Sequence, residues 1–225
     1  MGEVAVVLLS GGMDSAVAAA WAREGGSGIV ALTVDYGQRH HGEIEAARRI
    51  AAWAGAREHV LLSVDLRPVG GSVLTGEGEV PKGGSAGGIP VTYVPARNTL
   101  LLSLALGLAE VRGAASIVIG VNRVDYSGYP DCRPEFLDAF RALIGVATRA
   151  GVEGRAPLLH APLLDLPKAA IVRLGARLKV PFAETRSCYD PGPCGGACGR
   201  CDACRLRREG FAEAGLPDPT RYAPA

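Results

Sequence analysis

The sequence predicts a doubly wound α/β fold, in which helices cover both faces of a mostly parallel sheet. Short apolar runs rich in β-branched residues alternate with segments whose apolar residues recur at helical spacing. A glycine-rich turn joins the first run to the first helical segment, and polar clusters follow several expected strands. Because such sheets bind ligands outside the carboxyl ends of their strands, we expect these clusters to converge on one cleft.

The first half of the chain alternates between strand and helix. The apolar run over residues 4–9 predicts a buried strand, and the alanine-rich residues 16–21 are mostly good helix formers. A second buried strand is expected over 29–35. Isoleucine and alanine recur at helical spacing between the charges of 41–54, which predicts a helix, and 58–64 predicts the third strand.

The alternation continues in the second half. Leucines at helical spacing predict a strongly apolar helix over 97–112, and 115–121 predicts the fourth strand. Helices are expected over 134–149 and 167–178, each with a proline in its first turn, where the missing N–H is not needed. Residues 158–162 form a weak fifth strand candidate.

One segment, residues 70–88, does not fit this alternation. It consists mostly of Gly, Ser, Glu, Pro and Lys with scattered Val and Leu. A segment of this composition buries too little apolar surface to order itself. We therefore expect a flexible insertion, which is either a floppy loop or a lid that closes over the bound ligands.

Composition restricts the class of protein and its partners. The chain has 225 residues, of which 48% are hydrophobic and 21% charged, as in a globular protein without a membrane span, so we expect a cytoplasmic location. A net charge of +1 argues against a nucleic-acid partner. The cluster of Arg205, Arg207 and Arg208 is interpreted as either a local basic patch or a solvated helix face.

The turn over residues 10–15, Ser-Gly-Gly-Met-Asp-Ser, has the features of a phosphate site. Paired glycines let backbone N–H groups face a ligand, and the following helix start adds a positive dipole end. The pattern is neither a Walker loop nor G-x-G-x-x-G, and it resembles the pyrophosphate loop of ATP pyrophosphatases. The loop residues expected to bind ATP are Leu9, Ser10, Gly11, Gly12, Asp14 and Ser15.

Three further groups are expected to act on the nucleotide. Arg97 and Lys168 each open a predicted helix, where the dipole disfavours a cation, so a catalytic role on the reacting phosphates is the better explanation than a surface ion pair. Asp14 is expected either to assist Mg²⁺ or to orient the loop. The residues expected to complete the ATP site at the strand ends are Asp35, Tyr36 and Gly120.

Six cysteines are present, and Cys198, Cys201 and Cys204 follow each other at a spacing typical of metal ligands. Cys188 is the expected fourth ligand, and Cys194 is the alternative. Four thiolates favour one structural zinc ion over an iron–sulfur cluster or redox thiols, and a disulfide framework is not expected in a cytosolic chain of this size.

Several motifs occur together in a specific order. They are Leu9-Ser-Gly-Gly-Met-Asp-Ser, Asp35-Tyr-Gly-Gln-Arg-His, Val94-Pro-Ala-Arg-Asn, Asp125-Tyr-Ser-Gly-Tyr-Pro-Asp-Cys-Arg, and Ser187-Cys-Tyr with the three spaced cysteines. In this order they closely resemble the 7-cyano-7-deazaguanine synthase family of the queuosine pathway, from about residue 4 to about residue 208. The loop by itself indicates only the superfamily, whereas the Ser-Gly-Tyr-Pro-Asp-Cys-Arg run and the cysteine set are more specific.

The resemblance implies a carbon–nitrogen ligase. ATP would adenylate the carboxylate of 7-carboxy-7-deazaguanine, ammonia would form the amide, and a second activation would remove the amide oxygen and leave the nitrile. Free ammonia is the simplest nitrogen source, because no glutaminase domain or Cys-His amidotransferase constellation is visible. The family also implies a structural zinc on the four cysteines and a homodimer.

The loop over 125–133 is the expected substrate pocket. A carboxylate accepts two N–H groups of a guanine-like edge at once, and Asp131 is preferred to Asp125 because it lies inside the family-specific run. Tyr129 or Tyr126 would stack on the base, and Arg133 would hold the substrate carboxylate. The alternative is a solvated turn. Cys132, in the same loop, is expected to have a packing or substrate-contact role.

Two other functions remain open from the sequence. The first is a tRNA sulfurtransferase, which shares the adenylating loop but needs a basic surface or a tRNA-binding appendage. The second is a non-catalytic nucleotide-binding module. For the domain organisation, we expect an ATP pyrophosphatase domain over 1–185, with the insertion inside it, and a zinc-binding segment over 186–225.

Overall fold

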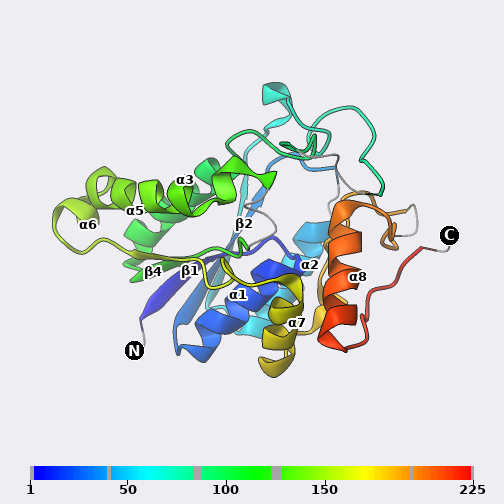
Figure 1. Cartoon of the computed structure of the whole chain (residues 1–225). Coiled ribbons are helices and arrows are strands. Elements are labelled where there is room, and N and C mark those ends of the chain that lie inside the picture. The colour runs from blue at the N-terminus through cyan, green and yellow to red at the C-terminus, as the bar shows by residue number, and fades with distance from the viewer. Residues whose placement is uncertain (1–2, 40–41, 84–87, 123–127, 193–194, 224–225) are drawn as a thin grey trace.

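The computed structural model describes residues 3–39, 42–83, 88–122, 128–192 and 195–223 (Figure 1). Its centre is a five-stranded sheet in the order β3-β2-β1-β4-β5, and every pair of neighbouring strands is parallel. The strands are β1 (Val4–Leu8), β2 (Gly28–Asp35), β3 (Glu58–Ser63), β4 (Ser116–Val118) and β5 (Leu158–His160). The predicted fold class is confirmed. The strand order reverses between β1 and β4, so the expected ligand crevice lies where these two strands end.

Helices cover both faces of the sheet (Figure 1). One face carries α1 (Met13–Glu24), α2 (Gly42–Ala54) and α7 (Lys168–Arg177), with α8 (Asp202–Ala214) packed on α7. The other face carries α3 (Arg97–Arg112) and α5 (Pro134–Ala147), which is followed by the short α6 (Arg149–Val152). Single 3₁₀ turns occur at Arg67–Val69, Pro130–Cys132 and Phe182–Glu184. The expected helices are therefore confirmed within a few residues, and α8 is an addition that the sequence analysis did not assign.

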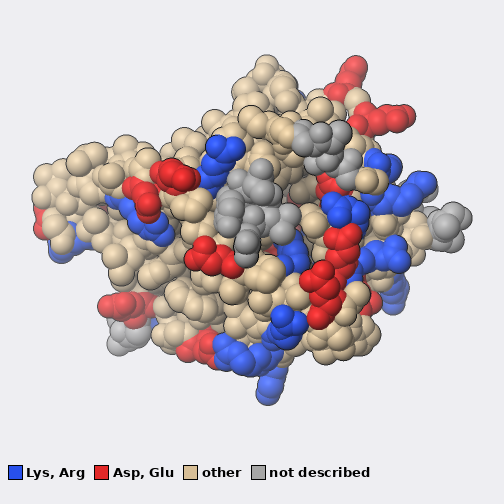
Figure 2. Space-filling view, viewed as in Figure 1, with Lys and Arg blue, Asp and Glu red and all other residues tan. Residues whose placement is uncertain are grey.

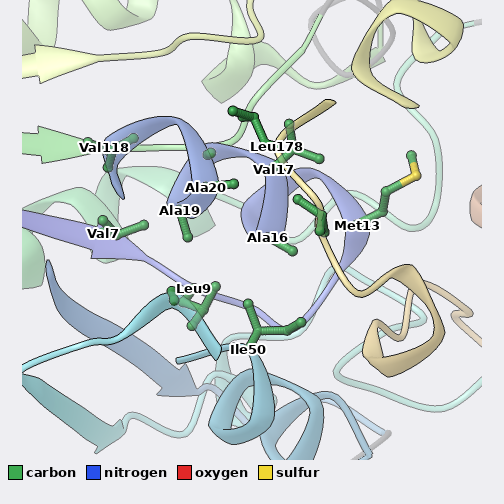
Figure 3. Packing of buried hydrophobic residues seen from close by; sticks show 14 of the residues in the cluster. Val7, Leu9, Met13, Ala16, Val17, Ala19, Ala20, Ile50, Val118 and Leu178 are labelled. Atoms are coloured by element: carbon green, nitrogen blue, oxygen red, sulfur yellow. The ribbon is translucent and has the colours of Figure 1, made fainter. Parts of the chain in front are cut away.

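Each face of the sheet has its own apolar core, because side chains of the central strand β1 alternate between the two faces. Ala5 and Val7 of β1 pack beneath α1, whereas Val6 and Leu8 face α3, because successive side chains of a strand point to opposite faces. Helix α1 is buried on nearly all sides, and its many alanines allow the close approach of the sheet and of its helical neighbours (Figure 3). This packing fixes the start of α1 at the end of β1.

The described part of the insertion, residues 70–83, packs against a remote segment of the chain. Leu74 and Val80 are 5% and 4% exposed and form a third apolar cluster with Val94 and the cysteine segment. Lys82 pairs with Cys201 in an isolated β-bridge, and the Gly83 N–H donates to the Arg200 carbonyl at 3.1 Å. The cysteine segment thus supplies apolar partners that the composition of the insertion does not indicate, and the flexibility of the insertion stays a prediction. Its closure as a lid stays a prediction.

The arginines of α8 differ from one another. Arg207 is only 3% exposed and pairs with Asp218, so neither a basic patch nor a solvated face describes it. Arg205 forms exposed ion pairs with Asp202 and Glu209. On the face drawn in Figure 2, acidic and basic side chains are interspersed. Across the described ranges, no helix combines the length and the apolar character needed to cross a membrane.

Candidate active site and metal centre

A cavity of about 240 Å³ lies at the carboxyl ends of the central strands, as the reversal of strand order predicts. Its wall combines the β1–α1 turn, the end of β2, the first turns of α2, α3 and α7, the residues after β4, and the segment that precedes the cysteines. Of the residues expected to bind ATP, those in the wall are Leu9, Ser10, Gly12, Asp14, Ser15, Tyr36 and Gly120.

The other two expected ATP residues, Gly11 and Asp35, are not among the wall residues. Gly11 has φ +84°, and a Cβ there would lie 2.2 Å from the Glu43 carbonyl oxygen, so only glycine fits. Gly12, by contrast, lines the cavity, and a Cβ there would come no closer than 3.4 Å to Ser10 Oγ. The Asp35 carboxylate accepts the Gly37 N–H at 3.1 Å and so shapes the turn after β2.

The loop is held from a distant part of the sequence. The Arg186 N–H donates to the Gly11 carbonyl at 2.9 Å, and Ser187 Oγ accepts the Met13 N–H at 3.3 Å. Within the loop, the Ser10 and Ser15 hydroxyls are 3.0 Å apart and Ser15 Oγ donates to the Gly12 carbonyl. The hydrogen bonds therefore fix the loop shape through Ser187, the residue immediately before Cys188.

Asp14 and Lys168 form an ion pair in the wall, with Lys168 Nζ 2.6 Å from Asp14 Oδ2. Their side chains are 24% and 12% exposed, and Asn122 Nδ2 donates to the same Asp14 oxygen at 3.2 Å. The other oxygen, Asp14 Oδ1, is buried and has no hydrogen-bond partner among the described residues. A buried, unpartnered carboxylate oxygen beside a phosphate loop fits a Mg²⁺ ligand.

Arg97 approaches the cavity from the first position of α3. Its preceding residue, Ala96, has φ +53°, a left-handed conformation that is uncommon outside glycine and turns the chain sharply into the helix. Arg97 Nη1 lies 3.4 Å from the Tyr36 hydroxyl, and its guanidinium carbon lies 5.8 Å from the ring centroid. The structure thus brings the expected cations, Arg97 and Lys168, into one cavity wall with Asp14.

The expected substrate loop is only partly brought to the cavity. Tyr129 lines it, with its ring 6.0 Å from that of Tyr93. Asp131 is 5% exposed and is not a wall residue, because its Oδ2 accepts the Asn98 N–H at 2.8 Å in the first turn of α3. Arg133 is exposed and is the N-cap residue that precedes α5. Asp125 and Tyr126 lie outside the described residues.

Asp131 therefore holds α3 in place. This geometry does not favour the expected contact of Asp131 with the deazaguanine base. Cys132 is 2% exposed, lines the cavity and accepts from Asn98 Nδ2 at 3.1 Å, in keeping with a packing or contact role. Sequence reasoning missed Glu43, a carboxyl group of the wall. Acidic residues are favoured in the first turn of any helix, so its position in the sequence carried no separate signal.

The four expected cysteine ligands come together. The sulfur atoms of Cys188, Cys198, Cys201 and Cys204 all lie within 4.8 Å of one another, and three of these residues are buried. Cys194, the alternative ligand, lies outside the described residues. Hydrogen bonds among these crowded thiols lower the pKa of Cys201 and raise the pKa values of Cys188 and Cys204. The cluster could therefore hold a metal ion.

Backbone N–H groups support these sulfurs. Those of Asp190 and Cys198 donate to Cys188 Sγ at 3.4 and 3.2 Å, and that of Cys201 donates to Cys198 Sγ at 3.3 Å. Lys82 Nζ lies 3.6 Å from Cys198 Sγ and 2.5 Å from Asp190 Oδ2. Such donors stabilise thiolate charge, so the surroundings fit a metal bound by thiolates.

Known proteins match this chain along nearly its whole length. A protein of Sphingopyxis alaskensis named "7-cyano-7-deazaguanine synthase 1" is 60% identical over 222 residues, which cover 99% of each chain. A "7-cyano-7-deazaguanine synthase" of Xanthomonas campestris pv. campestris is 62% identical over 219 residues, which cover 97% of each chain.

A solved structure, that of NMN synthetase from Francisella tularensis, aligns with a TM-score of 0.50 at 19% identity and covers 96% of this chain and 79% of that one. At this identity the likeness concerns the fold alone. The sequence model of a protein family described as "Queuosine biosynthesis protein QueC" matches residues 4–215. Together with the two synthases that are 60% and 62% identical, this match means that the chain belongs to the QueC family, the family of the 7-cyano-7-deazaguanine synthases.

Proposed function

We propose that this chain is a carbon–nitrogen ligase that converts 7-carboxy-7-deazaguanine and ammonia into 7-cyano-7-deazaguanine at the expense of ATP. A carboxylate is a poor electrophile, because its charge repels nucleophiles and its oxygen leaves badly. Adenylation removes the charge and makes AMP the leaving group, after which ammonia gives the amide. The amide oxygen presents the same difficulty, so the same cavity serves a second activation and the loss of AMP leaves the nitrile.

The observation that carries this proposal is the composition of one cavity wall. Residues of the β1–α1 turn, the ion pair of Lys168 with Asp14, and Arg97 all line the same cavity at the switch point of the sheet. Pyrophosphate leaves with negative charge, which fixed cations in a partly dry site stabilise without reorganisation. Lys168 and Arg97 are therefore assigned to the reacting phosphates.

Asp14 is assigned to Mg²⁺ through its unpartnered Oδ1. The ion, when bound, would neutralise phosphate charge and hold the nucleotide in a reactive geometry. The Lys168 ammonium, 2.6 Å from Asp14 Oδ2, holds this carboxylate in place in the cavity wall.

The deazaguanine ring is assigned to the part of the cavity lined by Tyr129, whose flat face offers a stacking surface. Tyr129 is held by its hydroxyl, which lies 2.9 Å from the Thr92 hydroxyl. The proposal also includes ammonia as the nitrogen donor, a homodimeric assembly of this protein and a cytoplasmic location.

The metal of the four cysteines is proposed to be one structural zinc ion per chain. Four thiolates complete a tetrahedral zinc shell and leave no open position for chemistry. Cys188 follows Ser187, whose Oγ accepts the Met13 N–H at the start of α1. The zinc would therefore keep the phosphate loop in shape without touching substrate.

The proposal is tested by incubating the purified protein with ATP, 7-carboxy-7-deazaguanine and ammonium chloride. Mass spectrometry should find the nitrile, and AMP and pyrophosphate should each form once per activation. Omitting ammonium should leave pyrophosphate formation with no amide or nitrile. Pyrophosphate release that depends on bulk tRNA instead of the deazaguanine would refute the proposal.

A further inference from the structure

Glu43 is a carboxyl group of the cavity wall that the activation chemistry does not use. It lies in the first turn of α2, half-buried, with its backbone carbonyl packed against Gly11. A Cβ on Gly11 would come within 2.2 Å of that carbonyl oxygen, so Glu43 is fixed directly beside the phosphate loop. The bond between substrate and α-phosphate has to form at this loop, which places Glu43 next to the reacting atoms.

Glu43 differs from the other carboxylate in the described part of the wall. Asp14 is committed to Lys168 and Asn122. The Glu43 carboxylate accepts no hydrogen bond from the described residues, and its electrostatic neighbours are Arg97 and the Tyr36 phenol. A carboxylate without a fixed donor is free to take a proton from a substrate.

The surroundings of Glu43 also tune its basicity. Burial raises the pKa of Glu43 to about 7, against the opposing effect of the Arg97 guanidinium. A general base works best when its pKa lies near the working pH. The charged and titratable groups that share the described wall with it are Asp14, Tyr36, Arg39, Arg97, Tyr129, Cys132, Lys168, Arg186, Tyr189 and Arg207.

Both later steps of the proposed reaction release protons. When ammonia attacks the acyl adenylate, a C–N bond forms, the C–O bond to AMP breaks, and the nitrogen loses one proton to become the neutral amide. In the second round, the adenylated amide nitrogen loses its remaining protons while the C–O bond to AMP breaks and the C≡N bond is completed. AMP carries away the electron pair of the C–O bond, so each proton needs an acceptor near the nitrogen.

We propose that Glu43 is the catalytic base that accepts these protons from the substrate nitrogen. This inference rests on the proposed function, since the protons belong to the amide and nitrile steps. Substrate therefore has to bind with its reacting carbon between the β1–α1 turn and the first turn of α2. Proton transfer then passes from nitrogen to the Glu43 carboxylate and on to solvent through the open side of the cavity.

The test compares Glu43→Gln with Glu45→Gln, its matched control. Glu45 lies in the same helical turn, its side chain is 66% exposed, and Arg48 is its ion-pair partner among the described residues. The first assay is pyrophosphate exchange into ATP with the carboxylate substrate, which needs no base. The second supplies the amide itself with ATP and no ammonia, so that only the dehydration is measured.

We expect Glu43→Gln to retain exchange within a few-fold and to lose about 10²–10⁴-fold in amide turnover, with Glu45→Gln unchanged in both. Wild-type amide turnover should rise with pH through about 7, because only the deprotonated carboxylate accepts a proton. Glu43→Asp should keep that pH profile at a lower rate, and Glu43→Gln should lose it.

The unfavourable outcomes are separable. Unchanged amide turnover in Glu43→Gln, or loss of exchange and turnover together, overturns the role of Glu43 as base and leaves the proposed function standing. A wild-type protein that exchanges pyrophosphate but forms no nitrile from either substrate overturns the proposed function, and the base with it.

Discussion

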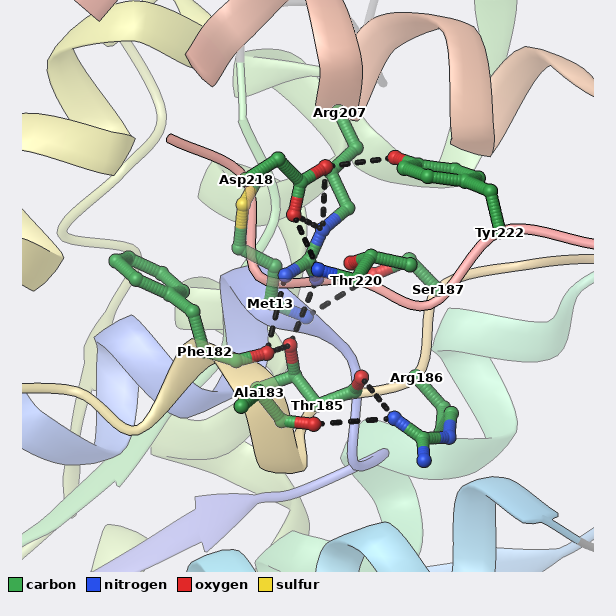
Figure 4. Close-up of polar contacts among 10 residues, drawn as sticks. All are labelled: Met13, Phe182, Ala183, Thr185, Arg186, Ser187, Arg207, Asp218, Thr220 and Tyr222. Carbon is green, nitrogen blue, oxygen red and sulfur yellow. Dashed lines mark hydrogen bonds and ion pairs between the residues drawn. The ribbon is translucent and has the colours of Figure 1, made fainter. Parts of the chain in front are cut away.

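The carboxylate of Asp218 joins a buried network behind the phosphate loop (Figure 4). It accepts hydrogen bonds from Arg207 Nε at 3.1 Å and from the Tyr222 hydroxyl at 2.6 Å. The same guanidinium donates to Thr185 Oγ1 at 2.7 Å and to the Phe182 carbonyl at 3.0 Å. The ion pair is therefore shut away from water, with Arg207 and Asp218 only 3% and 10% exposed.

Asp218→Asn keeps the size of this side chain and removes its charge. Removing one partner of a buried ion pair costs about 3–5 kcal/mol of unfolding free energy. Arg207 retains two neutral acceptors, so we expect a loss of unfolding free energy just below this range, about 2–3 kcal/mol. For a chain of this length each kcal/mol shifts Tm by about 2–4 °C, so Tm should fall by roughly 5–10 °C.

The pH dependence gives a second readout. Burial by itself raises the pKa of Asp218, but the Tyr222 hydroxyl and the Arg207 charge outweigh it, so the pKa is lowered overall. A lowered folded-state pKa contributes stability above the unfolded value of about 3.9 and loses it as the pH falls through the folded value. The difference in unfolding free energy between wild type and Asp218→Asn should therefore be largest at neutral pH and become smaller in acid.

Urea unfolding at a series of pH values measures both effects. The matched control is Glu209→Gln, which breaks the exposed pair with Arg205 on the same helix and should cost about 0.3–0.5 kcal/mol. If Asp218→Asn costs no more than this control, or if its cost is the same in acid as at neutral pH, the reasoning about the buried pair is refuted.

Three further predictions concern the loop, the ion pair and the metal. Gly12→Val should fold but lose pyrophosphate release, because its side chain enters the cavity. Gly11→Ala should instead destabilise the fold, because its Cβ would lie 2.2 Å from the Glu43 carbonyl oxygen. Thermal unfolding and pyrophosphate assays should separate the two variants, and normal turnover in Gly12→Val would contradict the loop assignment. Lys168→Met should lower turnover by about 10²-fold with little change in Tm, measured by single-turnover kinetics, and an unaffected rate would remove Lys168 from the chemistry. Metal analysis should find about one zinc per chain, and chelation should lower Tm and weaken ATP binding through Ser187, while iron with a visible absorption band would contradict a zinc site.

The sequence predicted the residues that the candidate site takes from strand ends. The prediction failed for residues whose role depends on the direction of the side chain. Asp14, Arg97 and Lys168 share one cavity wall because each lies in the first turn of a helix at the carboxyl edge of the sheet. Asp131 was expected in the same wall, yet its carboxylate accepts a backbone N–H of α3. Turn-forming residues give a loop its place in the chain but not the direction of each side chain, which is set by packing against distant elements.

The insertion and the C-terminal helix show the same limit. A glycine-rich composition indicates a weak core, and only the folded chain brings Leu74 and Val80 against the cysteine segment. The sequence suggests that Arg207 is a surface charge. In the structure it forms a buried ion pair with Asp218, eleven residues later. Charge and composition are local properties, whereas burial depends on which remote segment covers them.

The amino-acid sequence by itself determined the doubly wound fold, the glycine-rich turn between the first strand and helix, and the cluster of four cysteines that could hold a metal. Each of these depends on periodicity or on spacing within a short segment, which local backbone geometry is enough to fix. Only the tertiary structure decided that Ser187 holds the phosphate loop, that Asp131 supports α3, and that Glu43 faces the cavity. These contacts join residues far apart in the chain, so they exist only once long-range packing has chosen the neighbours of each side chain.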